Sequence, residues 1–75
     1  MRYALRMARI RTGMTQSEMA RLVGLTRASY TNIEKGHKNP SVVTALRIAK
    51  VLNRPMEELF VDELSPLRTE KVEEK

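Results

Sequence analysis

Apolar residues recur at three- and four-residue steps along most of the first sixty positions, a spacing typical of amphipathic helices. Capping residues and glycines interrupt these stretches at short intervals. No long stretch alternates with a period of two, and a short strand is left open only at residues 60–64. The pattern therefore predicts an all-α fold.

Capping residues predict where five helices begin and end. Thr15 and Glu18 have the spacing of a capping box, and Gly24 suits a left-handed helix stop. Thr26 and Ser41 are expected to cap two further helices. The predicted helices cover residues 3–12, 16–23, 27–35, 42–52 and 56–60. The short interval between the second and third helices has the helix-turn-helix spacing.

The fourth predicted helix has the clearest apolar stripe. Its members recur at three- and four-residue steps: Val42, Ala45, Leu46, Ala49 and Leu52. We expect this stripe to face the core. The first helix allows no such prediction, because its apolar residues lie among arginines on several sides.

The length and composition limit the class of protein. A chain of 75 residues is long enough for one small domain only. Without cysteine, and with His37 as its one histidine, it has no ligand set for a structural zinc, and no cofactor is expected. The longest uncharged stretch, residues 39–46, is far shorter than the roughly 18 residues of a membrane-spanning helix. Arginines near the start argue against a secretion signal, so a cytoplasmic location is expected.

The charge is unevenly distributed. Residues 1–50 carry ten Lys/Arg and two acids, whereas residues 51–75 carry four Lys/Arg and seven acids. A basic body indicates a polyanionic partner, with nucleic acid as the first candidate and an ordinary solvated surface as the alternative. One histidine, no cysteine and no well-spaced pair of acids leave nothing to carry acid–base or nucleophilic catalysis, so no enzyme is predicted.

The third predicted helix has one side suited to reading bases. At about 100° per residue, Arg27, Ala28, Thr31 and Asn32 fall on one side and the apolar residues fall on the other. In a major groove, arginine can pair with guanine, asparagine can pair with adenine, and alanine can touch a thymine methyl group. The alternative is an ordinary solvated helix face.

One set of linked motifs spans most of the chain: MTQSEMA (14–20), GLTR (24–27), IEKG (33–36), NPS (39–41), IAKVL (48–52) and ELF (58–60). Together with Tyr30, these motifs resemble the phage lambda-type Cro/repressor helix-turn-helix family, also called the XRE family. The resemblance implies five helices and sequence-specific binding to double-stranded DNA, usually as a dimer and usually in transcriptional regulation. Tyr30 replaces a commonly aliphatic residue, so the third helix is expected to sit slightly differently.

The resemblance also implies roles for single residues. Gln16 matches a glutamine that contacts a phosphate. Arg9 and Glu34 match a structural ion pair between the first and third helices. Contacts to the DNA backbone are expected at the helix starts and in the loop after the third helix, from Thr15, Gln16, Thr26, Ser29, Lys35, Lys38 and Asn39.

A homodimer on a palindromic operator is expected, because one recognition helix reads too few base pairs for a unique address. The apolar residues beyond the fourth helix are the expected interface: Leu59, Phe60, Val61 and Leu64. The alternative is that they close the core. Residues 1–64 are predicted as the DNA-binding domain and residues 65–75 as a charged, frayed tail.

The expected function is a transcriptional regulator without a sensor domain or a small-molecule ligand. A restriction–modification controller, a phage-type repressor and an antitoxin-type autoregulator fit the sequence equally well. The alternative is a protein-interaction module whose helix-turn-helix no longer reads DNA.

Overall fold

The computed structural model describes residues 1–61, which form five helices. In chain order these are α1 (Tyr3–Thr12), α2 (Gln16–Val23), α3 (Arg27–Lys35), α4 (Val42–Leu52) and α5 (Met56–Leu59). The described part contains no strand, so the predicted all-α fold is confirmed. Leu64, the domain boundary predicted there and the tail predicted at residues 65–75 lie outside the described residues.

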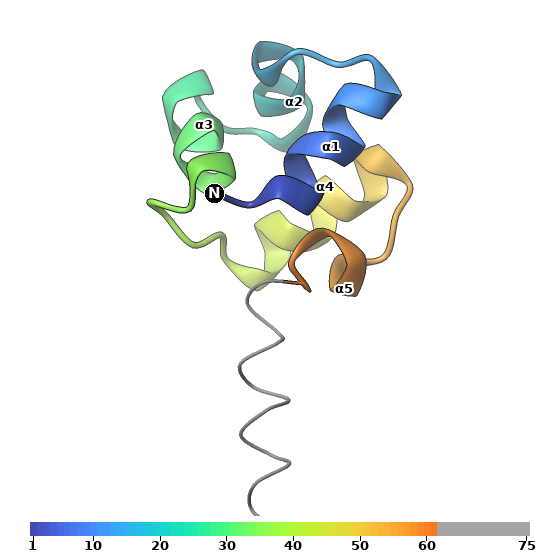
Figure 1. Cartoon of the computed structure of the whole chain (residues 1–75). Coiled ribbons are helices and arrows are strands. Elements are labelled where there is room, and N and C mark those ends of the chain that lie inside the picture. Colours follow the sequence, from blue (N-terminus) through green and yellow to red (C-terminus); the bar gives the residue numbers. More distant parts are fainter. Residues whose placement is uncertain (62–75) are drawn as a thin grey trace, which may run out of the picture.

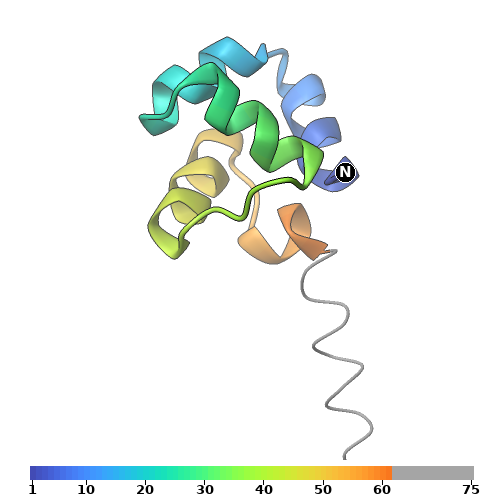
Figure 2. The ribbon, with the colours of Figure 1, turned by 90° about the vertical axis from the view of Figure 1, so that its left-hand side faces the viewer.

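The helices pack around one centre (Figure 1). α2 contacts both α3 and α4, while α1 contacts α3, α4 and α5. Figure 2 shows α3 lying across the front of the molecule, with α4 and α5 below it. α3 therefore lies on the surface with one long side uncovered. None of the helices within residues 1–61 is long and apolar enough to cross a membrane.

Local capping groups fix the start of α2 and the turn between α2 and α3. The Thr15 hydroxyl accepts from the Glu18 N–H at 3.0 Å, and the Glu18 carboxylate accepts from the Thr15 N–H at 2.9 Å, which completes the predicted capping box. Thr26 caps α3 by accepting from the Ser29 N–H at 3.1 Å. Gly24 has φ +79°, in the left-handed region where a Cβ atom is strained.

The core is built from side chains of all five helices. Its buried apolar members are Leu5, Ala8, Met19, Ala20, Val23, Tyr30, Ile33, Ala45, Ile48, Leu52, Leu59 and Phe60. In α1, where the sequence defines no inner face, Leu5 and Ala8 point inward, while Met7 and Ile10 remain exposed.

The predicted inner stripe of α4 is partly wrong. Ala45 and Leu52 are buried as expected, but Val42 and Leu46 are 70% and 50% exposed. Ile48, which the predicted stripe omits, is fully buried. Residues 45, 48 and 52 also lie on one side of a helix, and packing against α1, α2 and α5 selects that side. α4 therefore leaves apolar groups on the surface.

Candidate nucleic-acid interface

The outward side of α3 gathers the residues predicted to read bases. Arg27, Ala28 and Asn32 are exposed, and Thr31 is half-buried. Together with the exposed Lys35, they line one shallow depression along the helix. The other side of α3 is buried in the core, so the helix presents this polar and basic side to a partner.

The buried carboxylate of Glu34 ties α3 to α1 and α2. Arg9 donates to it through Nε at 2.6 Å and through Nη2 at 3.2 Å, forming the expected ion pair. The Tyr30 hydroxyl donates at 2.8 Å and Gln16 Nε2 at 3.1 Å. Burial raises the pKa of Glu34, but these hydrogen bonds lower it by more, so the pKa lies below its usual value. α3 is therefore anchored to α1 and α2 by a charged carboxylate that accepts four hydrogen bonds.

Tyr30 contributes to this cluster in a way that an aliphatic residue could not. Its ring is fully buried while its hydroxyl bonds to Glu34. Burial and the hydrogen bond to Glu34 raise the pKa of the Tyr30 hydroxyl well above its usual value. The hydroxyl therefore remains protonated and serves as a donor.

Gln16, predicted to contact a phosphate, is engaged within the protein. Its Nε2 donates to Glu34, and its Oε1 accepts from Thr31 Oγ1 at 3.1 Å. A carboxylate only accepts, so Glu34 orients the amide with its oxygen towards Thr31. The amide nitrogen of the half-buried Gln16 carries a second hydrogen besides the one donated to Glu34, and its contact with a phosphate stays a prediction.

The other residues predicted to contact phosphate lie at two helix starts and after α3. Thr15 and Thr26 are exposed, and their oxygens accept the capping bonds of α2 and α3. Ser29 is half-buried in the first turn of α3. Lys35 and Lys38 are exposed at the end of α3 and in the loop that follows.

A second depression lies at the start of α2 and carries an arginine that the sequence analysis missed. Arg6 lines it together with Arg9, Arg27 and Gln16. Positive side chains beside a helix N-terminus favour an anion. Arg6 precedes Arg9 by three residues, and this spacing on one side of α1 is the signal that could have identified it.

Arg2 is also missed by the sequence analysis, and it contacts the loop after α3. Its side chain is buried, Nη2 donates to Asn39 Oδ1 at 2.6 Å, and Nη1 donates to the Lys38 carbonyl at 3.0 Å. No local pattern marks Arg2, because these partners lie 36 and 37 residues away in the sequence.

The residues predicted as a dimer interface are mostly internal. Leu59 and Phe60 are 2% and 8% exposed and belong to the core, as in the alternative considered for them. Val61 is half-buried, and Leu64 lies outside the described residues. α1 and α4 both contact α5, which carries Leu59, whereas Phe60 is buried but still lines a groove. A partner that binds beside α5 would therefore contact mainly the exposed side chains around Leu59 and Phe60.

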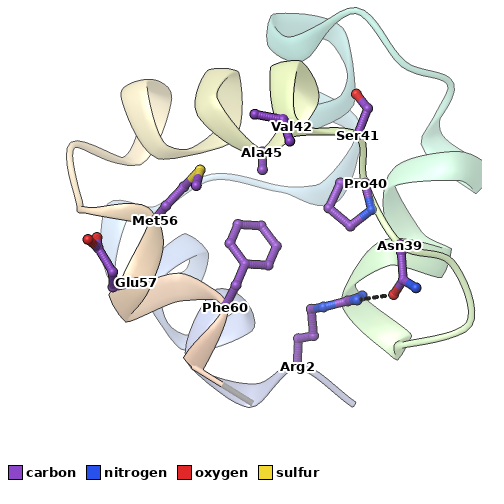
Figure 3. A pocket seen from close by; sticks show the side chains of 9 residues that line it. All are labelled: Arg2, Asn39, Pro40, Ser41, Val42, Ala45, Met56, Glu57 and Phe60. Carbon is purple, nitrogen blue, oxygen red and sulfur yellow. Dashed lines mark hydrogen bonds between the residues drawn. The ribbon is translucent and has the colours of Figure 1, made fainter. Parts of the chain in front are cut away.

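An apolar groove between α4 and α5 lies beside these residues. It is lined by Arg2, Asn39, Pro40, Ser41, Val42, Ala45, Met56, Glu57 and Phe60 (Figure 3). The exposed Val43 and Leu46 extend the apolar surface along α4. We call the surface formed by Val42, Leu46 and Met56 the α4–α5 patch.

The chemistry available on the α3 side is hydrogen bonding and charge attraction. Its outward residues offer a guanidinium, an amide, a hydroxyl and an ammonium group, without an acidic side chain among them. Within residues 1–61, no three potential ligand residues gather to hold a metal ion. The arrangement is suited to contacts with a polyanion whose edges carry donors and acceptors.

Comparison with known proteins identifies the family. The family described as Helix-turn-helix matches residues 5–59. An uncharacterised HTH-type transcriptional regulator from Archaeoglobus fulgidus is 44% identical over 61 residues, covering 81% of this chain and 87% of the relative. A similar regulator from Methanothermobacter thermautotrophicus is 42% identical over 62 residues, covering 81% of this chain and 90% of the relative.

Two further proteins resemble the chain. Antitoxin HipB from Escherichia coli is 31% identical over 67 residues, covering 89% of this chain and 76% of HipB. The crystal structure of the restriction–modification controller protein C.AhdI from Aeromonas hydrophila superposes with a TM-score of 0.71 and 37% identity, covering 76% of this chain and 86% of C.AhdI. These matches confirm the resemblance seen in the motifs. The chain therefore belongs to the XRE-type helix-turn-helix family of DNA-binding transcriptional regulators.

Proposed function

We propose that the protein is a sequence-specific regulator that binds a palindromic operator as a homodimer, with α3 in the major groove. One observation carries the proposal. The outward side of α3 combines Arg27, Thr31 and Asn32, and its inner side is anchored by the buried Glu34 cluster. A rigid helix with base-reading side chains meets the geometric requirement for direct readout.

Groups suited to backbone contacts surround this side of α3, which supports the proposal. Lys35 and Lys38 lie at the end of α3 and in the loop after it, and Arg6, Gln16 and the Thr15 hydroxyl lie at the start of α2 beside the helix. In this arrangement, phosphate contacts on both sides would fix the register of α3 on the duplex while α3 reads the bases.

The α4–α5 patch is the surface we propose for dimerisation. Val42 is 70% exposed and lines the groove with Met56, and Leu46 is 50% exposed and lines a neighbouring depression with Met56. Exposed apolar patches next to polar rims mark protein interfaces. The patch shares no residue with the outward side of α3, so we expect a two-fold axis here to leave both copies of α3 free. The half-sites would then be about 10 base pairs apart.

A comparison of selected and shuffled duplexes tests this function. Duplexes are enriched from a random pool, and their affinity is compared at one fixed salt concentration with that of shuffled versions of the same composition. The proposal predicts about a thousandfold or greater preference for the selected duplexes. Equal affinity for both sets would contradict sequence-specific binding.

A second candidate function is a partner-binding, antitoxin-like role. Two observations favour it: the 31% identity to antitoxin HipB and an exposed apolar side of α1 formed by Tyr3, Met7 and Ile10. A protein that binds no duplex even at low salt would favour this second function over the first.

A further inference from the structure

Two charged side chains within residues 1–61 are buried, Arg2 and Glu34. The bonds of Glu34 to Arg9 and Gln16 anchor α3 to α1 and α2. Arg2 lies just before α1, is 3% exposed, and takes no part in the Glu34 side-chain cluster. Burying a guanidinium costs free energy unless its donors are bonded. The partners of Arg2 therefore indicate what its burial achieves.

The guanidinium of Arg2 bonds to the end of the recognition helix and to the loop that follows. Nη1 donates to the Ile33 carbonyl and, at 3.0 Å, to the Lys38 carbonyl. Nη2 donates to Asn39 Oδ1 at 2.6 Å. The backbone N–H of Arg2 also donates to the Glu34 carbonyl at 2.8 Å. One side chain thus connects α3 to both residues of the loop that were predicted to contact phosphate.

The location of the guanidinium suits a fixed cation. The carbonyls at the C-terminal end of α3 carry the negative end of the helix dipole, which favours a positive charge there. The ring of Phe60 lies beneath the guanidinium, with its centroid 5.8 Å from Cζ. Figure 3 shows Arg2 between Phe60 and Asn39. The planar fork can bond several oxygens in one plane, which a lysine ammonium cannot reproduce.

We propose that Arg2 is a positioning residue for DNA binding, which holds residues 37–40 so that Lys38 and Asn39 meet the phosphate backbone. The inference rests on the proposed function. Arg2 captures Oδ1 of Asn39, so the amide hydrogens of Asn39 face away from Arg2, and a phosphate only accepts hydrogen bonds. It also fixes the backbone of Lys38, whose exposed side chain supplies the charge.

A mutant cycle on the salt dependence of binding tests this role. The effect of Lys38→Ala on the salt dependence of binding is measured in the wild type, in Arg2→Lys and in Arg2→Met. Arg11→Met is the control, because it also removes one positive charge, but from an exposed residue of α1. In the wild type and in Arg11→Met, Lys38→Ala should lower the slope of log K against log salt by about one. In both Arg2 variants, Lys38→Ala should leave the slope nearly unaltered. Without the bonds from Arg2, Lys38 no longer contacts the phosphate, so its removal has little further effect.

Hydrogen exchange of the free protein gives a readout that does not depend on DNA. The His37 and Lys38 amides donate to the Asn32 carbonyl at 2.9 and 3.2 Å. Their exchange should become at least about tenfold faster in Arg2→Lys, while amides in α2 keep their rates. A wild type that binds no duplex would refute the proposed function, whereas unchanged exchange of the two loop amides would refute the role of Arg2.

Asn39→Ala keeps the test decisive if both Arg2 variants unfold. This substitution removes the hydrogen bond from Arg2 Nη2 to Asn39 Oδ1 by changing an exposed loop residue, and it leaves the buried Arg2 in place. Faster exchange of the His37 and Lys38 amides in this variant would support the proposal. Unchanged exchange, together with a Lys38→Ala slope change of about one in both the wild type and Asn39→Ala, would overturn it.

Discussion

The Thr31 hydroxyl donates to the side-chain oxygen of Gln16 at 3.1 Å, and this one bond determines what Thr31 offers to DNA. Glu34 orients the Gln16 amide, so the Thr31 hydrogen is used within the protein. Thr31 then presents lone pairs and a methyl group outward. In the proposed complex, an acceptor in this position would favour adenine or cytosine, the two bases whose amino groups lie in the major groove.

The first prediction follows from this bond. Thr31→Val should lose discrimination at one base position by about 0.5–1.5 kcal/mol, the net value of one hydrogen bond, while Thr31→Ser should retain it. The measurement is the affinity for operator duplexes that carry each of the four bases at each position. A preference for thymine or guanine at the affected position would show that the Thr31 hydroxyl donates to DNA rather than to Gln16.

Glu34 predicts a loss of stability in acid. Its pKa in the folded protein lies below its unfolded value of about 4.3, so its bonds stabilise the fold above that pH. This contribution should be lost as the pH falls through the folded-state pKa. Glu34→Gln should be less stable at pH 7 by about 3 kcal/mol, because Arg9 loses its charged partner.

Urea unfolding between pH 7 and pH 3 measures this dependence. The wild type should lose stability below about pH 4, and Glu34→Gln should show a flatter profile. Glu57→Gln, which changes an exposed carboxylate on α5, serves as the control and should follow the wild type. Identical profiles for the wild type and both variants would show that Glu34 does not control acid stability.

The left-handed backbone conformation of Gly24 predicts that substitutions there lower the stability by different amounts. A Cβ there would meet Arg47 Nη1 at 3.5 Å, an ordinary contact, so the cost of adding a Cβ atom arises from φ +79°. Gly24→Val should lower the stability by about 2 kcal/mol and weaken DNA binding, since the turn orients α3. Gly24→Asn should cost less, because asparagine tolerates this region. Equal melting temperatures for the two variants would contradict this explanation.

The α4–α5 patch predicts the effect of surface charges on assembly. Leu46→Glu should convert a dimer into a monomer without unfolding it, because Leu46 is 50% exposed in one chain. Leu22→Glu, at a comparably exposed site on α2, is the control and should remain dimeric. Sedimentation at micromolar concentration distinguishes these outcomes. A dimer that survives Leu46→Glu would place the interface elsewhere, and a wild type that stays monomeric on DNA would refute dimerisation.

Local signals predicted the helices well because each capping bond joins residues close in sequence. Thr15 with Glu18 and Thr26 with Ser29 are three residues apart, and Gly24 acts through its own backbone. The outward side of α3 followed from helical geometry in the same way.

Features set by long-range packing could not be predicted in this way. Ile48 and Leu46 are two residues apart and therefore lie on nearly opposite sides of α4, and the neighbouring helices decide which side is buried. The side-chain partners of Arg2 and Gln16 lie 15 or more residues away in the sequence. Leu59 was predicted at an interface because a count of apolar residues does not show how much of α5 is covered by α1 and α4.

The most direct test of base reading by α3 is duplex selection from a random pool at one fixed salt concentration, with the wild type, Arg27→Ala and Asn32→Ala in parallel. We predict that the wild type selects two inverted half-sites about 10 base pairs apart. Each variant should lose preference at one position, repeated in both half-sites, at a cost of about 1–3 kcal/mol. Selected sequences that are identical for all three proteins, or a pool without any enriched site, would contradict the placement of α3 in the major groove.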